Sequence, residues 1–132
     1  MLIWDEARHA LAVAEMDAAH REFVELVNAA WAADDASFAD AFAALAEHTR
    51  AHFEREGQLM RATRFFATGE HEGEHRRVLG ELAAMQMSVR RGRFSAARIW
   101  LRDGVSDWFH RHLATMDAAL TAWVRRLESR LG

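Results

Sequence analysis

The chain contains no cysteine and no proline, and only seven of its 132 residues are glycine. Without cysteine it can form neither a disulfide nor a metal site with thiolate ligands. Without proline, and with little glycine, few positions would break a helix, and the abundant alanine, leucine and arginine favour helix over strand. These absences predict an all-α protein.

Lysine is also absent, so all 17 basic residues are arginine, and the net charge is only −3. The arginines are scattered along the chain, which indicates a compositional bias rather than a phosphate-binding surface, and we expect no nucleic-acid or membrane partner. No apolar run is long enough to cross a bilayer or to resemble a secretory signal. We therefore expect a cytoplasmic protein, whose protein partners the sequence does not identify.

Length and composition predict a single domain over residues 1–132, because 51% hydrophobic residues suffice for a core at this size. Residues 1–16 have the pattern of an N-terminal arm with a few apolar anchors. Residues 17–131 contain four segments with apolar residues at helical spacing, at about 17–33, 37–63, 69–90 and 95–131. Four amphipathic helices joined by short turns predict an up-down-up-down antiparallel four-helix bundle.

Three local signals mark the expected helix ends. Asp17 suits the N-cap of the first helix, and Ser37 with Asp40 three residues later resembles a capping box for the second. Gly92 suits the C-terminal cap of the third helix.

Eight histidines are an unusually high number for this length. Five of them, with two carboxylates, lie on helix faces that should point into the bundle: His20, His52, Glu56, His71, His75, His112 and Asp117. Burying so many polar groups without partners would cost about 1–3 kcal/mol each. A shared metal centre would remove this cost, and we predict these seven residues as its ligands.

Spacing along the helices supports a shared centre. His52 and Glu56 are four residues apart, as are His71 and His75, so each pair stacks on adjacent turns of one helix face. His112 and Asp117 are five apart and would diverge by about 140° on a regular helix. Either the centre lies between these two residues or a local π-type turn brings them together.

The donor set favours oxygen binding. If both carboxylates and one oxo or hydroxo group bridge two octahedral irons, five imidazoles leave one coordination position open. The chain lacks the paired Glu-x-x-His motifs of ferritin-like diiron sites. A histidine-rich centre carries less negative charge and should bind oxygen rather than split it, although affinity order alone does not select iron over zinc.

These motifs resemble the hemerythrin family, in its bacterial branch, along nearly the whole chain. The matching segments are Trp4-Asp5, Leu11-Ala12-Val13, Met16 to His20, His52-Phe53-Glu54-Arg55-Glu56, Leu59-Met60, His71 with His75, and Trp108 to Leu113 with Asp117. The resemblance implies a non-heme diiron centre that binds molecular oxygen. It implies that one iron is held by His71, His75 and His112. It implies that a second iron, which keeps the open position, is held by His20 and His52, and that both irons are bridged by Glu56 and Asp117.

The chain departs from the family pattern outside the ligands. Gly57 replaces a frequent second glutamate, Ala12 a glycine and Ala19 a common glutamine, and the usual Gly-Tyr-Pro loop is Arg64-Phe65-Phe66. Phe109 stands where the family often has leucine near the oxygen pocket. We expect Phe109 to line that pocket, with Met116, beside Asp117, as a further candidate.

The leading hypothesis is therefore a reversible oxygen carrier, store or buffer. Alternatives are an oxygen- or redox-sensing module and a peroxide- or nitric-oxide-consuming diiron enzyme. No acid–base residue is evident beside the ligands, so we expect no enzymatic activity. We interpret His9 and His110 as surface or rim histidines, and His48 either as an ordinary polar residue near the end of the bundle or as a hydrogen-bond partner of a ligand.

Overall fold

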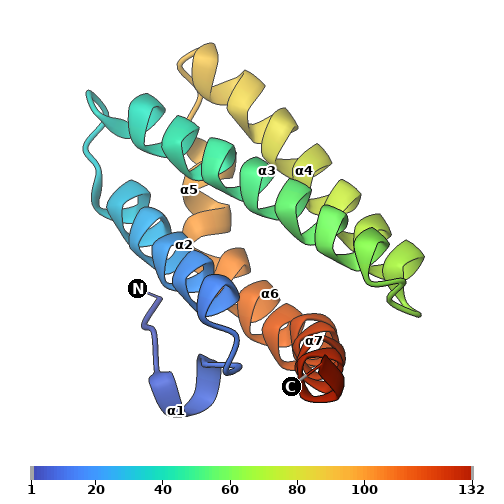
Figure 1. Ribbon diagram of the computed structural model, residues 1–132. Helices are drawn as coiled ribbons and strands as arrows, with labels where there is room; N and C mark the ends of the chain where they lie inside the picture. The colour runs from blue at the N-terminus through green and yellow to red at the C-terminus, as the bar shows by residue number, and fades with distance from the viewer. Residues whose placement is uncertain (1, 132) are drawn as a thin grey trace.

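A computed structural model describes the backbone of residues 2–131, and all of its regular structure is helical (Figure 1). The helices are α1 (Glu6–His9), α2 (Ala14–Ala32), α3 (Phe38–Ala62), α4 (Thr68–Arg90), α5 (Ser95–Ile99), α6 (Val105–His112) and α7 (Ala118–Leu131). Two π-helical segments, η1 (Trp100–Gly104) and η2 (Leu113–Asp117), join the last three helices into one continuous rod. The predicted all-α bundle with four long rods and an N-terminal arm is confirmed.

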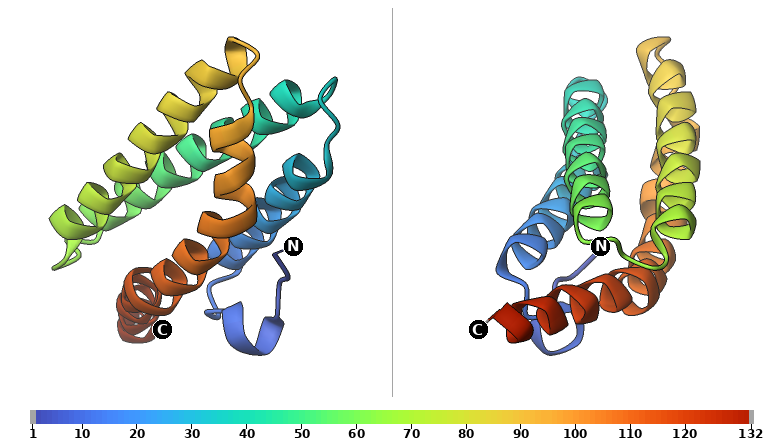
Figure 2. Two further views of the ribbon diagram at one scale, coloured as in Figure 1. Left: turned by 180° about the vertical axis from the view of Figure 1, so that it is seen from behind. Right: turned by 45° about the vertical axis from the view of Figure 1, so that its right-hand side comes forward.

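The chain reverses direction between successive rods. Figures 1 and 2 show α3 and α4 side by side, α2 along the other flank of α3, and the fourth rod crossing behind them. Within that rod, α5 packs against α4 and η1 packs against α2, so the fourth rod closes the bundle. The rod bends along its length, as expected where π turns interrupt a helix.

Two apolar clusters form the core, and α2, α3 and the fourth rod contribute residues to both of them. The larger cluster includes Phe23, Val24, Phe42, Leu45, Phe53, Val78, Leu82, Leu101, Val105, Phe109 and Leu113. The smaller one contains Met16, Met60, Phe65, Leu120 and Val124. Between their positions in the two clusters, these three rods carry predicted ligands; on α2, for example, His20 lies between Met16 and Phe23. On α4, His71 and His75 lie between Val78 of the larger cluster and the loop residue Phe65 of the smaller one. The sequence therefore sets a polar layer between two apolar layers.

The first helix begins earlier than predicted. It starts at Ala14, its N-cap Val13 makes no side-chain cap hydrogen bond, and Asp17 lies inside the first turn. The predicted N-cap at Asp17 is therefore wrong. Its carboxylate instead accepts a hydrogen bond from the backbone N–H of Leu11 at 2.8 Å, which ties the arm to α2.

The capping box at Ser37 and Asp40 is also wrong. Ser37 makes no side-chain cap hydrogen bond, because its hydroxyl and its backbone N–H both donate to Asp34 Oδ1. Asp34 thus forms the turn before α3. The predicted end of α3 near Thr63 is confirmed, since Thr63 is its C-cap.

The end of α4 follows the predicted glycine cap. Gly92 has a φ of 77°, a left-handed conformation that favours glycine. The Gly92 N–H donates to the Val89 carbonyl, and the Arg93 N–H donates to the Ser88 carbonyl at 2.9 Å. These two bonds form a Schellman motif, which turns the chain toward the fourth rod.

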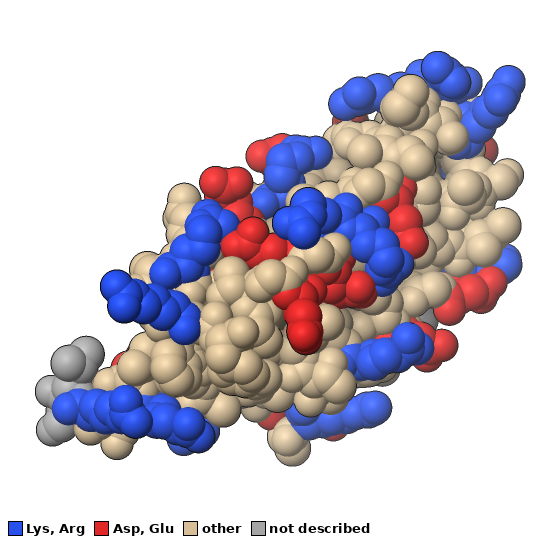
Figure 3. Space-filling model, turned by 90° about the vertical axis from the view of Figure 1, so that its right-hand side faces the viewer, with Lys and Arg blue, Asp and Glu red and all other residues tan. Residues whose placement is uncertain are grey.

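The face of the molecule in Figure 3 shows no continuous patch of one charge. Arginine and acidic side chains alternate on that face. Within residues 2–131, no helix combines the length and hydropathy needed to cross a bilayer.

Candidate metal centre

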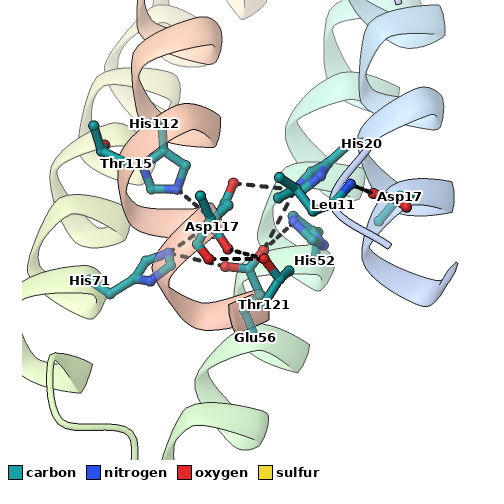
Figure 4. Close-up of polar contacts among 12 residues, drawn as sticks. Leu11, Asp17, His20, His52, Glu56, His71, His112, Thr115, Asp117 and Thr121 are labelled. Atoms are coloured by element: carbon teal, nitrogen blue, oxygen red, sulfur yellow. Dashed lines mark hydrogen bonds and ion pairs between the residues drawn. The ribbon is translucent and has the colours of Figure 1, made fainter. Parts of the chain in front are cut away.

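The seven predicted ligand side chains converge in the polar layer between the two apolar clusters. They come from α2, α3, α4, α6 and the end of η2, and each is only 1 to 7% exposed. Figure 4 shows the carboxylates of Glu56 and Asp117 in the middle, with His71 and His112 on one side and His20 and His52 on the other. Residues far apart in the sequence therefore meet at one buried point.

Glu56 turns its two oxygens toward different histidines. Its Oε1 lies 3.1 Å from His71 Nε2 and 3.4 Å from His75 Nε2. Its Oε2 lies 2.5 Å from His52 Nε2 and 3.9 Å from His20 Nε2. Each oxygen of this carboxylate therefore faces a different pair of histidines.

Asp117 divides its oxygens in the same way. Its Oδ1 lies 3.2 Å from His71 Nε2 and 3.3 Å from His112 Nε2. Its Oδ2 lies 3.3 Å from His20 Nε2. Both carboxylates therefore span the space between the same two sets of histidines.

Two donor groups result, and each is compact enough to surround one cation. The five-donor group contains Glu56, His71, His75, His112 and Asp117, and the three-donor group contains His20, His52 and Glu56. Within each group the ligand atoms lie within 4.8 Å of one another. Glu56 belongs to both, and Asp117 reaches His20 of the second with its Oδ2.

The π-helical segment η2 decides how His112 and Asp117 meet. It spans Leu113–Asp117, directly after His112. In a π turn the backbone hydrogen bonds link residues five apart, so residues at that spacing stack on one face. Of the two alternatives left open by the sequence, the structure has the π turn.

The buried polar atoms of the centre lack hydrogen-bond partners. Among the described residues, no partner exists for either ring nitrogen of His20, His71 and His112, for Nε2 of His75, for both oxygens of Glu56 or for Oδ1 of Asp117. Buried polar atoms are almost always paired. Cations held among these imidazole nitrogens and carboxylate oxygens would satisfy them, so the residues present fit a metal centre.

The charges of the centre are strongly coupled. Burial by itself would raise the pKa of both Glu56 and Asp117, but the histidine side chains that surround the two carboxylates hold both pKa values below their ordinary range. Burial would lower the pKa of His71, yet Asp117 and Glu56 outweigh it and raise that pKa to about 9. Burial lowers the pKa of His75 to about 3, and Glu56 offsets only part of this effect. The centre thus keeps two anionic carboxylates ready for cations.

Aromatic rings fix the orientation of two histidines. Phe53 stacks on His75 with ring centroids 3.7 Å apart and planes at 5°. Trp108 stacks on His112 at 4.8 Å and 18°, and its indole N–H donates to Glu74 Oε1 at 3.0 Å. The sequence analysis gave neither aromatic residue a role at the centre. The sequence did contain one indication of the role of Trp108, because this residue precedes His112 by one helical turn and therefore lies on the same helix face.

His48 contacts the centre from its edge. Its Nε2 lies 3.1 Å from the carbonyl oxygen of Ala19, the residue before His20, and its ring is parallel to that of His52. The hydrogen bond therefore joins α2 to α3 next to two ligand positions. No hydrogen bond from His48 to a ligand side chain occurs among the described residues.

The two residues predicted to line an oxygen pocket lie beside different donor groups. Phe109 lies edge-on to the ring of His20, with ring centroids 6.2 Å apart, and stacks on Phe23, with ring centroids 5.3 Å apart. Met116 lines hollows that also include His112 or His71, so it lies beside the five-donor group.

The interpretation of His9 as a surface or rim histidine is wrong, because its side chain is buried. It is 3% exposed, its Nδ1 accepts from the Asp5 N–H, and its Nε2 lies 2.9 Å from His110 Nδ1. Its ring also packs edge-on against Phe109 at 5.7 Å. The short helix α1 folds the arm back onto α6, and this long-range contact, together with Trp4 at a ring-centroid distance of 5.3 Å, buries His9.

Comparisons with known proteins agree with this geometry. Residues 11–124, which include all seven ligand positions, match the family model for hemerythrin, described as a hemerythrin HHE cation-binding domain. The chain is 33% identical over 121 residues to a bacteriohemerythrin from Ralstonia nicotianae, a match that covers 92% of this chain and 87% of that protein. No solved structure gives a significant match.

Proposed function

The chain belongs to the hemerythrin family, and we propose on that basis that its buried centre holds two non-heme iron ions and binds molecular oxygen reversibly. In this proposal the protein is a carrier, store or buffer of oxygen and not an enzyme. When bound, iron supplies two accessible oxidation states, which reversible reduction of oxygen requires.

One observation carries the proposal: each carboxylate directs one oxygen to each donor group. Such carboxylates would bridge two ions, together with one oxo or hydroxo group. His71, His75 and His112 would hold the first iron. His20 and His52 would hold the second, and the smaller number of histidines leaves the open position there.

The surrounding residues favour binding over catalysis. Buried polar side chains near the centre but outside the seven are already hydrogen-bonded: Asp17 accepts from the Leu11 N–H, and the hydroxyls of Thr49 and Thr121 donate to backbone carbonyls. Among the described residues, the buried carboxyl groups are those of Glu56 and Asp117 in the donor groups and that of Asp17, whose Oδ1 already accepts the hydrogen bond from the arm. Phe109, at 4% exposure, helps to exclude water from His20.

Iron loading followed by oxygen exposure tests the proposal. The reduced protein, loaded without oxygen, should bind two irons per chain, develop a visible band with oxygen and lose the band when oxygen is removed. Asp117→Asn removes the anionic bridge and should lower iron content toward one per chain, whereas Asp107→Asn, an exposed control on α6, should retain two.

Irreversible oxidation without a reversible band would reject oxygen carriage. Catalytic consumption of peroxide or nitric oxide by the loaded protein would support the enzyme hypothesis instead, and a partner bound only in one oxygenation or redox state would support the sensor hypothesis. A cytoplasmic location and the absence of a nucleic-acid partner stay predictions.

A further inference from the structure

A small hollow opens onto the three-donor group between α2 and α3. His52 and Glu56 form its floor, and Met16, Ala19 and Leu59 form an apolar wall. The charged side chains of Glu15 and Arg55 lie at its rim and are exposed. We call this space the α2–α3 hollow.

The size and lining of the α2–α3 hollow suit a small uncharged molecule. Its volume is about 110 Å³. A water molecule takes up about 30 Å³ in the liquid, so the hollow has room for a diatomic molecule but not for a large ligand. The apolar wall offers no hydrogen bond to hold water, whereas the floor consists of two members of the group that keeps the open position.

The other approaches to the centre are closed or lead to the five-donor group, which three further hollows reach at His71, His75 or His112. On the side of the arm, Phe109 is stacked on Phe23 and covered by His9, so this ring closes the approach to His20. A larger apolar hollow of about 270 Å³ is lined by Met116 and Ala119, but it leads to His71, in the five-donor group.

We infer that the α2–α3 hollow is the route by which oxygen, or another small uncharged diatomic molecule, reaches the centre, and that the small side chain of Ala19 keeps it open. This inference rests on the proposed function for the position of the open site. It assigns Ala19 and Leu59 to control of ligand access rather than to metal binding.

Stopped-flow mixing of the reduced, iron-loaded protein with oxygen tests the route. Ala19→Leu should slow oxygen association and dissociation each by about tenfold and leave the equilibrium constant within about twofold, because a narrower route affects both directions equally. Leu59→Ala should speed both rates. Ala119→Leu is the matched control, since it fills the hollow beside Met116 with the same added side chain, and its rates should stay within about twofold of the wild type.

Xenon provides a second measurement that does not depend on oxygen chemistry, because it occupies dry apolar cavities. In the zinc-loaded protein, xenon should shift the backbone amide signals of Ala19 and His20, and Ala19→Leu should abolish these shifts. Wild-type rates in Ala19→Leu, or equal slowing by Ala119→Leu, would overturn the inference.

Failure of the proposed function gives a different result. In that case the wild-type protein itself shows no reversible band. The rate at which oxygen oxidises its iron would still depend on the route, so slowing of that oxidation by Ala19→Leu alone, with loss of the xenon shifts, would support the inference independently.

Discussion

Glu56 and Asp117 are short side chains on different rods, and each reaches both donor groups. This requires each carboxylate to lie between two sets of histidines rather than beside one. Such placement buries two anions that would repel each other without cations or protonated imidazoles between them. In the metal-free protein, the raised pKa of His71, about 9, favours a protonated imidazole beside both carboxylates, and metal ions would replace that proton.

The metal-free protein should therefore have its greatest stability near pH 6.5, judged from His71 and His75. The folded pKa of His71 is raised to about 9, so its contribution is complete below 6.5 and is lost as the pH rises toward 9. The folded pKa of His75 is lowered to about 3, so its contribution is lost as the pH falls from 6.5 toward 3. Urea unfolding of the metal-free protein across this range would measure the maximum. A midpoint that rises steadily from pH 6.5 to 9 would contradict the role of His71.

Trp108 should hold His112 in its orientation by stacking. Trp108→Phe keeps an aromatic face but loses the hydrogen bond to Glu74, and we expect a loss of about 0.5–1.5 kcal/mol in unfolding free energy with little change in metal retention. Trp108→Ala removes the stack as well and should release metal to a chelator about tenfold faster. Chelator competition measures the rates. Equal release from both variants would show that stacking does not orient His112.

At the scale of the element, η2 places an aspartate five residues after a histidine on the same face. A regular helix places residues four apart on one face, whereas a π turn does so for residues five apart. The π-helical segment Leu113–Asp117 thus contains one residue more than an α-helical turn with the same two ends would need. The helix α7 follows it and places Leu120 in the smaller apolar cluster.

Deletion of the exposed residue Thr115 should convert the π turn into an α-helical turn and still leave the aspartate on the same face as His112, now four residues away. We expect most metal binding to remain. Insertion of one alanine after Thr115 places the two ligands six apart and should abolish binding at the centre. Metal content and circular dichroism distinguish these outcomes. Greater damage from the deletion than from the insertion would contradict this account of η2.

At the scale of the whole molecule, a polar layer separates two apolar clusters, and all four rods contribute side chains to it. Each rod contributes at least one predicted ligand, so bound metal would link the rods more directly than the turns do. Without metal, the unpaired atoms of this layer oppose burial.

Removal of metal should therefore lower the stability of the whole bundle rather than of one helix. A ligand that binds only the folded state adds about 1.4 kcal/mol for each tenfold excess over its dissociation constant. Unfolding midpoints measured at increasing free metal concentration should rise accordingly, with far-ultraviolet and tryptophan signals changing together. A midpoint that does not depend on metal would place the metal outside the folded core.

The sequence by itself determined the helical class, the four rods and the seven inward polar residues. Helical periodicity carries this information, because apolar residues such as Phe23 and Val27 share a face with His20 whatever the neighbouring helices do. The family motifs indicated the same ligands, and the family itself is confirmed by the comparisons.

Only the tertiary structure decided which groups face each other. Asp17 bonds to the arm instead of capping its helix, His9 is buried against His110, and a π turn rather than an intervening centre aligns His112 with Asp117. In each case a polar group has several possible partners, and the choice depends on segments distant in the sequence. Residue spacing along the chain cannot predict that choice. The partner of each group is selected by competition for hydrogen bonds and buried space once the rods have packed.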